Sequence, residues 1–309
     1  MPELPELEVT KARLRLTLAG RQVTGITLRQ PFCLKTVEPP LTALAGAHFQ
    51  GVARHGKFLC LSTDKKLFFC VHLMLTGELA LVPTAEPMSR SHLLALHLDD
   101  STDLRVIETG TKHRVAVHVV TDPKQIPWIA QVGLDPMAPE FTLAHFRSRV
   151  THRNQTVKNF LTNQRSIAGI GNCYSDEILF EARLSPLQLT GNLKQEEVIR
   201  LFAACKKVLA DAIIHLKAAG AEHNRDAGHY PFRSDGKGSR PKSPKPEVLF
   251  PTRQDRTFLR VHSRLGEPCF VCGSEIRRVS YVDSTTYYCP GCQTGGNILA
   301  DRRFSKFLK

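Results

Sequence analysis

Four cysteines near the end of the chain constrain its folding more than any other feature of the sequence. They form two close pairs, Cys269-Phe-Val-Cys272 and Cys289-Pro-Gly-Cys292, with sixteen residues between them. This spacing lets four thiolates surround one tetrahedral zinc ion, and a site closed by four cysteines leaves no position for water or substrate. We therefore predict one structural zinc ion bound by Cys269, Cys272, Cys289 and Cys292.

The residues between the two pairs indicate what this metal holds in place. Ile276–Val279 and Thr285–Tyr288 have the composition of short strands, so we expect a zinc-bound β-hairpin. The alternative is that the two cysteine pairs arose by chance. Residues that suit tight turns lie beside both pairs and argue against chance: Pro268, Gly273 and Gly291.

The other five cysteines are scattered among mostly apolar neighbours, which is typical of buried thiols in a reducing compartment. They are Cys33, Cys60, Cys70, Cys173 and Cys205.

The sequence has no apolar run of about 18 residues, and acids stand where a signal peptide would have a basic region. We expect a soluble intracellular protein of the cytoplasm, with no membrane partner.

The charge balance points to an anionic partner. The 309 residues include 42 Lys and Arg against 29 Asp and Glu, a formal net charge of +13. Such an excess favours binding to dense negative charge, above all to nucleic-acid phosphates. The alternative is a soluble protein that is merely basic.

Hydrophobic spacing changes along the chain and predicts a multidomain α+β fold. Residues 5–19 have a helical pattern, and residues 21–120 hold short apolar runs such as Phe58–Leu61 and His92–Leu98, punctuated by turn residues. These runs predict a β-sandwich or barrel. Helical spacing then extends over 136–220.

These changes divide the chain into four predicted segments. A basic stretch rich in Gly, Pro and Ser, with Asp235 as its single acid, occupies Ser234–Pro246 and reads as a loop. The segments are an N-terminal β-sandwich domain over 1–135, a helical domain over 136–225, a basic loop or linker over 226–258, and a zinc finger with a C-terminal tail over 259–309.

A glycine-rich turn lies between two helical patterns, in Ser166–Tyr174. Gly169 and Gly171 permit close approach of the backbone, so the turn can present N–H groups and the Asn172 amide to a phosphate. The alternative is an ordinary turn between helices.

The N-terminus can supply a nucleophile. Met1 precedes a small residue and is expected to be removed, which exposes the secondary amine of Pro2. This amine is less basic than that of lysine, so more of it is neutral near pH 7. Glu3 beside it can move protons. Alternatively, Pro2 is only a common second residue and Glu3 only compensates a helix dipole.

The order and spacing of these motifs resemble the formamidopyrimidine-DNA glycosylase and endonuclease VIII family over nearly the whole chain. The matching segments are Pro2–Glu8, Arg54–Leu59, His72–Gly77, Gly133–Pro136, Gly169–Glu177, Val261–Cys269 and Cys289–Gln293. The resemblance implies an N-terminal β-sandwich with an N-terminal helix, a helix-two-turn-helix domain and a C-terminal zinc-finger β-hairpin.

The resemblance also implies a bifunctional DNA glycosylase and AP lyase of base excision repair. Such an enzyme flips an oxidised or ring-opened base out of double-stranded DNA, removes it and cuts the abasic strand. Pro2 would attack C1′ to form a Schiff base, Glu3 would be the acid/base partner, and Lys57 would contact phosphate and assist proton transfer. We expect a monomer that acts at the nucleoid. Lys57 is otherwise just a charge at a strand edge.

Three further DNA-binding roles follow from the resemblance. Lys158 and Asn172 would hold the phosphates beside the lesion, and Leu75 would fill the gap left by the flipped nucleotide. The alternative for Lys158 is a solvated charge on a helix.

The chain departs from the family pattern at groups that meet the lesion. Ser284 stands where many relatives have a finger arginine, and Arg277 or Arg278 is the candidate substitute. The family's Asp-Pro-Arg-Arg-Phe-Gly loop aligns with Glu108–His113, where Lys112 offers a substitute contact. Leu75 stands where the family usually has a methionine, and leucine is also an acceptable apolar wedge.

These departures leave the preferred lesion and the second elimination open. They also motivate a rival hypothesis, a non-catalytic protein that binds damaged or abasic DNA on the same scaffold. A third hypothesis is a general zinc-finger protein that binds nucleic acid without preference for damage.

Overall fold

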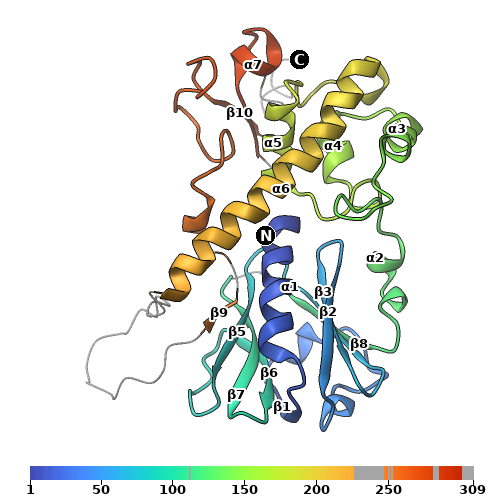
Figure 1. Cartoon of the computed structure of the whole chain (residues 1–309), viewed down its shortest axis with the longest axis vertical. Helices are drawn as coiled ribbons and strands as arrows, with labels where there is room; N and C mark the ends of the chain where they lie inside the picture. The colour runs from blue at the N-terminus through green and yellow to red at the C-terminus, as the bar shows by residue number, and fades with distance from the viewer. Residues whose placement is uncertain (111–112, 226–246, 250, 252, 281–284, 301–309) are drawn as a thin grey trace, which may run out of the picture. The chain divides into compact units, whose positions relative to one another are not determined.

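A computed structural model describes residues 1–110, 113–225, 247–249, 251, 253–280 and 285–300. The chain forms two compact units (Figure 1). The first unit holds Met1–Ala130 and Ile213–Asp255, and the second holds Gln131–Ala212 and Arg256–Lys309. Because one compact unit can contain more than one domain, the four predicted segments stay a prediction.

The first unit is a β-sandwich with an N-terminal helix, as the sequence predicts. Helix α1 (Leu4–Leu18) comes first, close to the predicted range. The strands are β1 (Val23–Leu28), β2 (Phe49–His55), β3 (Phe58–Thr63), β4 (Phe68–His72), β5 (Gly77–Pro83), β6 (His92–Leu98), β7 (Thr102–Glu108), β8 (Ala116–Val120) and β9 (Glu247–Val248). They form two antiparallel sheets, of order β1-β6-β7-β5-β9 and β2-β3-β4-β8.

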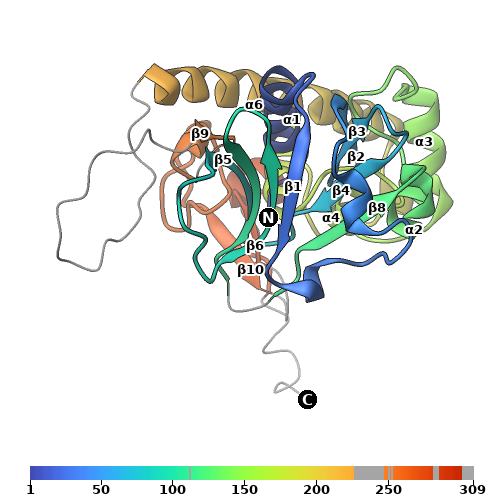
Figure 2. The ribbon, with the colours of Figure 1, turned by 90° about the horizontal axis from the view of Figure 1, so that it is seen from below.

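The core of this unit lies where the two sheets and α1 meet. Figures 1 and 2 show α1 beside β2 and between the sheets. Leu7, Leu14 and Leu18 of α1 pack in one cluster with residues of both sheets, among them Leu59 and Leu94. Burial of large apolar side chains of this kind stabilises the fold by about 1.5–3 kcal/mol each.

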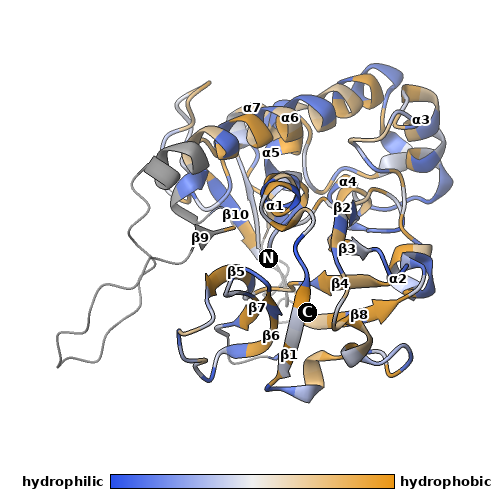
Figure 3. Cartoon of the chain, turned by 60° about the horizontal axis from the view of Figure 1, so that its bottom comes forward, coloured by the Kyte–Doolittle hydropathy of each residue, from blue (hydrophilic) through white to orange (hydrophobic). Residues whose placement is uncertain are grey.

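The β2-β3-β4-β8 sheet is also covered on its outer face, which explains why β3 and β4 are nearly continuous apolar runs. Alternate residues of β3 face opposite ways, so Leu59 enters the main core while Phe58 packs outward against Ile126 and Ile129. These isoleucines belong to the segment formed by η3 (Pro123–Gln125) and α2 (Pro127–Ala130). Figure 3 shows hydrophobic residues along β4 and β8.

The second unit contains the predicted helices and the predicted hairpin. Its helices are α3 (Leu143–His152), α4 (Val157–Thr162), α5 (Asn172–Glu181), α7 (Pro290–Thr294) and the part of α6 (Gln195–Arg225) that ends at Ala212. Strands β10 (Arg277–Ser280) and β11 (Thr285–Tyr288) pair antiparallel from Arg277–Tyr288 to Ser280–Thr285. The helix-two-turn-helix and hairpin predictions are confirmed.

Aromatic packing and helix caps account for the helical part of this unit. Phe141 stacks on Phe202 at 5.1 Å, and Phe146 meets Phe160 edge to face at 5.5 Å. The Thr156 hydroxyl accepts a hydrogen bond from the backbone N–H of Asn159 and so begins α4. The five scattered cysteines are all buried, as predicted. Among the described residues, no helix has the length and apolar character needed to cross a membrane.

The packing of α1 leads to a stability prediction with a matched control. Leu14 is fully buried, whereas Leu16 on the same helix is 85% exposed. Leu14→Ala removes buried methyl groups and leaves a cavity, so we expect it to lower the unfolding free energy by about 2–5 kcal/mol. Leu16→Ala should change that free energy by less than about 0.5 kcal/mol. Urea denaturation checks this, and equal effects of the two substitutions would contradict the described packing.

Candidate functional site

The residues predicted to carry out the chemistry lie at the start of α1. Glu3 is the N-cap residue, and its side chain accepts a hydrogen bond from the backbone N–H of Glu6. Glu6 reciprocates, since its Oε2 accepts from the Glu3 N–H at 3.0 Å. This capping box satisfies two N–H groups of the first turn. The capping box thus orients the side chain of Glu3, the residue that follows Pro2, and only 3% of Glu3 is exposed.

Lys57 lies in the two-residue turn that joins β2 to β3. His55 pairs with Phe58, and Gly56 has a φ of +58°, which glycine adopts without strain. Burial lowers the pKa of Lys57, while the negative charges of Glu3 and Glu6 oppose this shift. The structure therefore brings Lys57 and Glu3 together. Lys57 directly precedes β3 and is 7% exposed, so it is a buried lysine at a strand edge, and the role given to it stays a prediction.

A buried arginine connects α1 to this turn. The Nε of Arg54 donates to Oε1 of Glu8 at 2.7 Å, and its Nη1 donates to the carbonyl oxygen of Gly56 at 2.9 Å. Lys11 also pairs with Glu8, at 2.5 Å. Burial alone would raise the pKa of Glu8, but Lys11 and Arg54 together hold it below its usual value. Glu8 is thus an ionised anchor for the turn that carries Lys57.

His72 belongs to the same group of side chains, a role that the sequence reasoning missed. Burial, together with the positive charges of Lys57 and His118, lowers the pKa of His72 to about 4. Its Nδ1 accepts a hydrogen bond from the backbone N–H of Met74 at 3.1 Å, so the neutral ring carries its proton on Nε2. The only signal in the sequence was its place in the matched segment His72–Gly77.

Leu75 lies at the exposed turn between β4 and β5. The N–H of Gly77 donates to the carbonyl oxygen of Leu73 at 2.8 Å and closes this turn. A Cβ at Gly77 would lie 2.3 Å from that oxygen, so only glycine fits. Met74 has a φ of +52°, an unusual conformation for a bulky residue. The closed turn leaves Leu75 57% exposed, as a wedge requires.

Glu108 organises the loop that replaces the family's arginine-containing loop. Its Oε1 accepts hydrogen bonds from the backbone N–H groups of Arg114 at 2.8 Å and Val115 at 3.1 Å. The Nδ1 of His113 lies 3.6 Å from Oε2 of Glu108. Lys112, the predicted substitute contact, lies outside the described residues.

In the second unit, Lys158 is held by its own neighbours. Its Nζ donates to the carbonyl oxygen of Asn172 at 3.0 Å and pairs with Oδ1 of Asp176. The other oxygen of Asp176 lies 2.7 Å from Nδ1 of His262. Lys158 is 7% exposed, so its interpretation as a solvated helix charge is wrong. The Asn172 amide lies at the start of α5, where its Nδ2 donates to the carbonyl oxygen of Thr285 at 2.6 Å.

A buried glutamate fixes the segment that leads into the cysteine cluster. The carboxylate of Glu177 accepts hydrogen bonds from the backbone N–H groups of Arg260, Val261 and His262, at 2.8–2.9 Å. Burial raises the pKa of Glu177 although these bonds and the charge of Arg260 oppose the shift. Glu177 therefore joins α5 to the start of the finger segment.

The four predicted metal ligands converge. The sulfur atoms of Cys269, Cys272, Cys289 and Cys292 all lie within 4.8 Å of one another. Two of the separations are 3.8 Å, from Cys269 to Cys292, and 3.3 Å, from Cys272 to Cys289. A tetrahedron with metal–sulfur bonds of about 2.3 Å has sulfur atoms about 3.8 Å apart. The cluster thus fits a zinc-sized ion.

The cysteines of the cluster differ in their environments. Hydrogen bonds with Ser274 lower the pKa of Cys272 to about 6, which favours its thiolate, whereas burial raises the pKa of Cys289 to about 11 and also raises that of Cys292. A Cβ at Gly291 would lie 2.8 Å from the Cys272 sulfur, so glycine is required there. Ser284 lies outside the described residues. Of its two candidate substitutes, Arg277 is paired with Glu275 at 2.9 Å.

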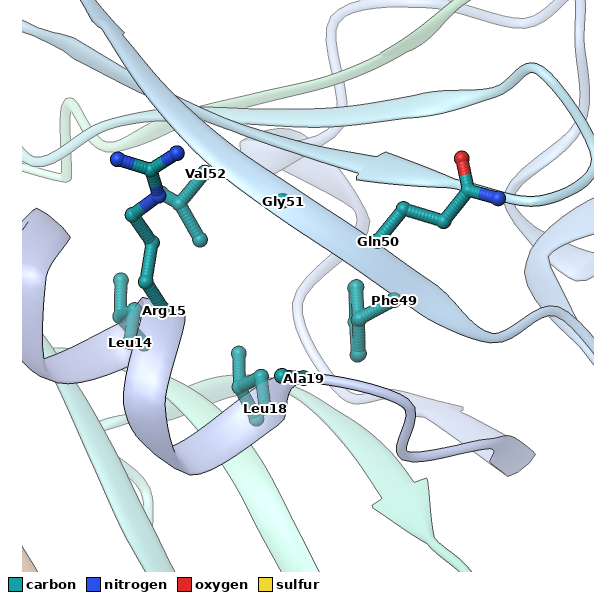
Figure 4. Close-up of a pocket in the computed structure, with 8 residues that line it drawn as sticks. All are labelled: Leu14, Arg15, Leu18, Ala19, Phe49, Gln50, Gly51 and Val52. Carbon is teal, nitrogen blue, oxygen red and sulfur yellow. The ribbon is translucent and has the colours of Figure 1, made fainter.

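A pocket near α1 is separate from this chemistry. Leu14, Arg15, Leu18 and Ala19 of α1 line it together with residues 49–52 of β2 (Figure 4). Leu14 is eleven residues after Glu3, about 16 Å along a helix. The pocket therefore lies towards the opposite end of α1 from Pro2.

Three features of this chain together define a class of DNA glycosylases. They are a β-sandwich with an N-terminal helix that starts with a carboxylate beside a buried lysine, a helix-two-turn-helix region, and a hairpin with four cysteines. Residues 1–114 match the pattern of the formamidopyrimidine-DNA glycosylase N-terminal domain. Residues 132–223 match the pattern of the formamidopyrimidine-DNA glycosylase H2TH domain.

Individual relatives agree over almost the full length of the chain. The formamidopyrimidine-DNA glycosylase of Geobacter sulfurreducens is 33% identical over 95% of this chain and 100% of that protein. The one of Symbiobacterium thermophilum is 31% identical over 98% of this chain and 93% of that protein. The chain therefore belongs to the formamidopyrimidine-DNA glycosylase family. This confirms the predicted family and enzyme class, a DNA glycosylase with AP lyase activity.

Solved structures support the same fold. The MutM (Fpg) protein of Thermus thermophilus has a TM-score of 0.75 and is 28% identical, with coverage of 96% of this chain and 100% of that one. Lactococcus lactis Fpg, solved with DNA that contains an abasic site, has a TM-score of 0.79 at 23% identity, with coverage of 94% and 99%.

The depressed pKa of His72 leads to a prediction about pH. The folded chain holds His72 neutral down to a pKa of about 4, whereas an unfolded chain protonates it near pH 6.5. The unfolded state therefore binds more protons between these values, so stability falls as the pH falls from about 6.5 to about 4. His72 alone should contribute a loss of about 2–4 kcal/mol over this range.

The test compares urea denaturation at pH 7 and pH 4.5. His72→Gln should lose less stability over this interval than the wild type, because glutamine does not titrate. His113→Gln is the control, since the His113 side chain is 55% exposed. An unchanged pH dependence in His72→Gln would contradict the described burial.

Proposed function

We propose that this chain removes an oxidised or ring-opened base from duplex DNA through a Schiff base on Pro2, and then cuts the abasic strand. The observation that carries the proposal is the proximity of Lys57 to Glu3, directly after Pro2. The relatives support the choice of partner, since Lactococcus lactis Fpg has been solved with abasic-site DNA and, as a variant, with Fapy-dG containing DNA.

The proposed reaction begins when removal of Met1 converts the Pro2 nitrogen from an amide into an amine. The amine attacks C1′, the bond between C1′ and the base breaks with the electron pair leaving on the base, and the attached nitrogen loses its proton. The nitrogen lone pair then forms the C=N bond as the C1′–O4′ bond breaks, and the electron pair of that bond goes to O4′, which is protonated. The resulting iminium makes the C2′ proton acidic, so loss of that proton expels the 3′ phosphate. Glu3, the residue after Pro2, exchanges protons with the sugar and the departing base, while the capping box holds its carboxylate on the backbone N–H of Glu6.

Lys57 supports these steps in two ways. The negative charges of Glu3 and Glu6 favour the ammonium form of Lys57 against the effect of burial, so this side chain can meet an anion beside Glu3. It also offers hydrogen bonds to a phosphate next to the lesion. The closeness of three reactive groups favours catalysis over the rival hypothesis of a protein that only binds damaged DNA.

We propose that the remaining predicted residues bind the DNA. Lys158 binds Asn172 and Asp176 through its Nζ, and the third N–H of this ammonium group is the one that would contact a phosphate. Asn172 contributes from the start of α5, where backbone N–H groups favour anions. Leu75 fills the gap left by the flipped nucleotide, and Lys112 supports the loop contact. The chain acts as a monomer.

Covalent trapping tests the proposed chemistry. Borohydride reduces the iminium, so the wild type should become linked to an abasic duplex. Pro2→Gly or Glu3→Gln should lower the trapping rate by about 100-fold or more. Lys65→Ala is the control, because it removes an exposed lysine from the other end of β3. If the wild type traps none of several damaged duplexes, the catalytic hypothesis fails and the binding protein becomes the better account.

The ion in the cysteine cluster is proposed to be zinc, which has the geometry and the thiolate preference for this site. Native mass spectrometry should show one zinc per chain. The Cys289→Ser variant should not retain the metal. Its DNA binding should be weaker by at least about tenfold, because the hairpin unfolds when the metal is absent. Cys33→Ser, which changes a buried cysteine outside the cluster, should keep the metal. A folded wild type without metal would refute the assignment.

A further inference from the structure

Trp128, the only tryptophan of the chain, is unusually exposed for its type. It lies on the short helix α2, where 64% of its surface is accessible. The same segment buries Ile126 and Ile129 against Phe58 on the outer face of the β2-β3-β4-β8 sheet. These isoleucines anchor α2, so the core does not require the indole.

The position of the indole connects it to the candidate catalytic residues of the same unit. Its ring centre is 5.9 Å from that of His72 and 6.4 Å from that of Phe58, with interplanar angles of 89° and 82°. Both neighbours are nearly perpendicular to it, so neither of them stacks on its face. Phe58 directly follows Lys57, and His72 lies within electrostatic reach of Lys57.

The surroundings of Trp128 carry positive charge. His118 lies 6.0 Å from Phe58, and the charge of Lys35 reaches His118. Burial and the charge of Lys35 lower the pKa of His118, so the positive charge in these surroundings comes from Lys35 and Lys57, next to an indole that is 64% exposed. Lysines beside an exposed indole favour a nucleic-acid strand over an apolar protein partner. The lysines can bind phosphates while the indole packs against a base or a sugar.

We propose that Trp128 is a further DNA-contacting residue, whose indole packs against the sugar or base of a nucleotide next to the one held at Lys57. This contact extends the proposed DNA-binding surface from Lys57, past His72, to Trp128. It rests on the proposed function, since it requires DNA to be bound at Lys57. Its contribution is to affinity and positioning rather than to bond breaking.

The single tryptophan makes the test direct, because all indole fluorescence of the full-length protein comes from this position. A duplex with a stable abasic-site analogue and a fluorescein label is titrated, and label anisotropy and tryptophan emission are recorded together. Tryptophan emission should be quenched and should saturate at the same DNA concentration as the anisotropy. Trp128→Ala should weaken binding about tenfold, and Trp128→Phe by no more than about threefold.

Controls separate this inference from the function on which it rests. Leu16→Ala, at another exposed apolar residue of the same unit, should bind DNA like the wild type. The urea midpoint of Trp128→Ala should match that of the wild type. Anisotropy that saturates without quenching, or wild-type affinity in Trp128→Ala, overturns the inference alone. A wild type that binds no duplex at all overturns both the inference and the proposed function.

Discussion

The ion pair between Glu8 and Arg54 joins the two chain segments that bring the candidate catalytic groups together. Glu8 lies one turn after the start of α1, and Arg54 also holds the carbonyl oxygen of Gly56, next to Lys57. The Arg54 side chain is 2% exposed, so removal of Glu8 would leave a buried charge at a cost of about 3–5 kcal/mol. Because a misplacement of about 1 Å can cost about 100-fold in rate, the chemistry proposed for Pro2 depends on this pair.

The features that the sequence predicted well are those set by local pattern. The spacing of Cys269 to Cys292 was enough to predict a metal-sized cluster, since short turns bring each pair together. The helical spacing of 5–19 and the short apolar run His92–Leu98 placed α1 and β6 to within about one residue. Composition alone did not favour a site at Pro2. The order of the motifs along the chain is what indicates a catalytic role for Pro2.

The features that sequence did not predict depend on contacts between distant segments. The carboxylate shared by Lys158 and His262 joins residues about a hundred positions apart, so no local pattern distinguishes the buried Lys158 from a solvated lysine. No role was predicted for His72, because its apolar neighbours indicate only a strand; its proximity to Lys57 appears once β3 and β4 pair. Trp128 becomes noticeable for the same reason, through packing of α2 on that sheet.

The proposed reaction depends on a covalent bond between the nitrogen of residue 2 and the sugar. Mapping the bond tests this most directly: the wild type is reduced with borohydride on an abasic duplex, digested with protease and nuclease, and sequenced by tandem mass spectrometry. We expect the remnant of the sugar on the peptide that begins at Pro2, with Met1 absent. Attachment to Lys57 or to any other lysine would contradict it.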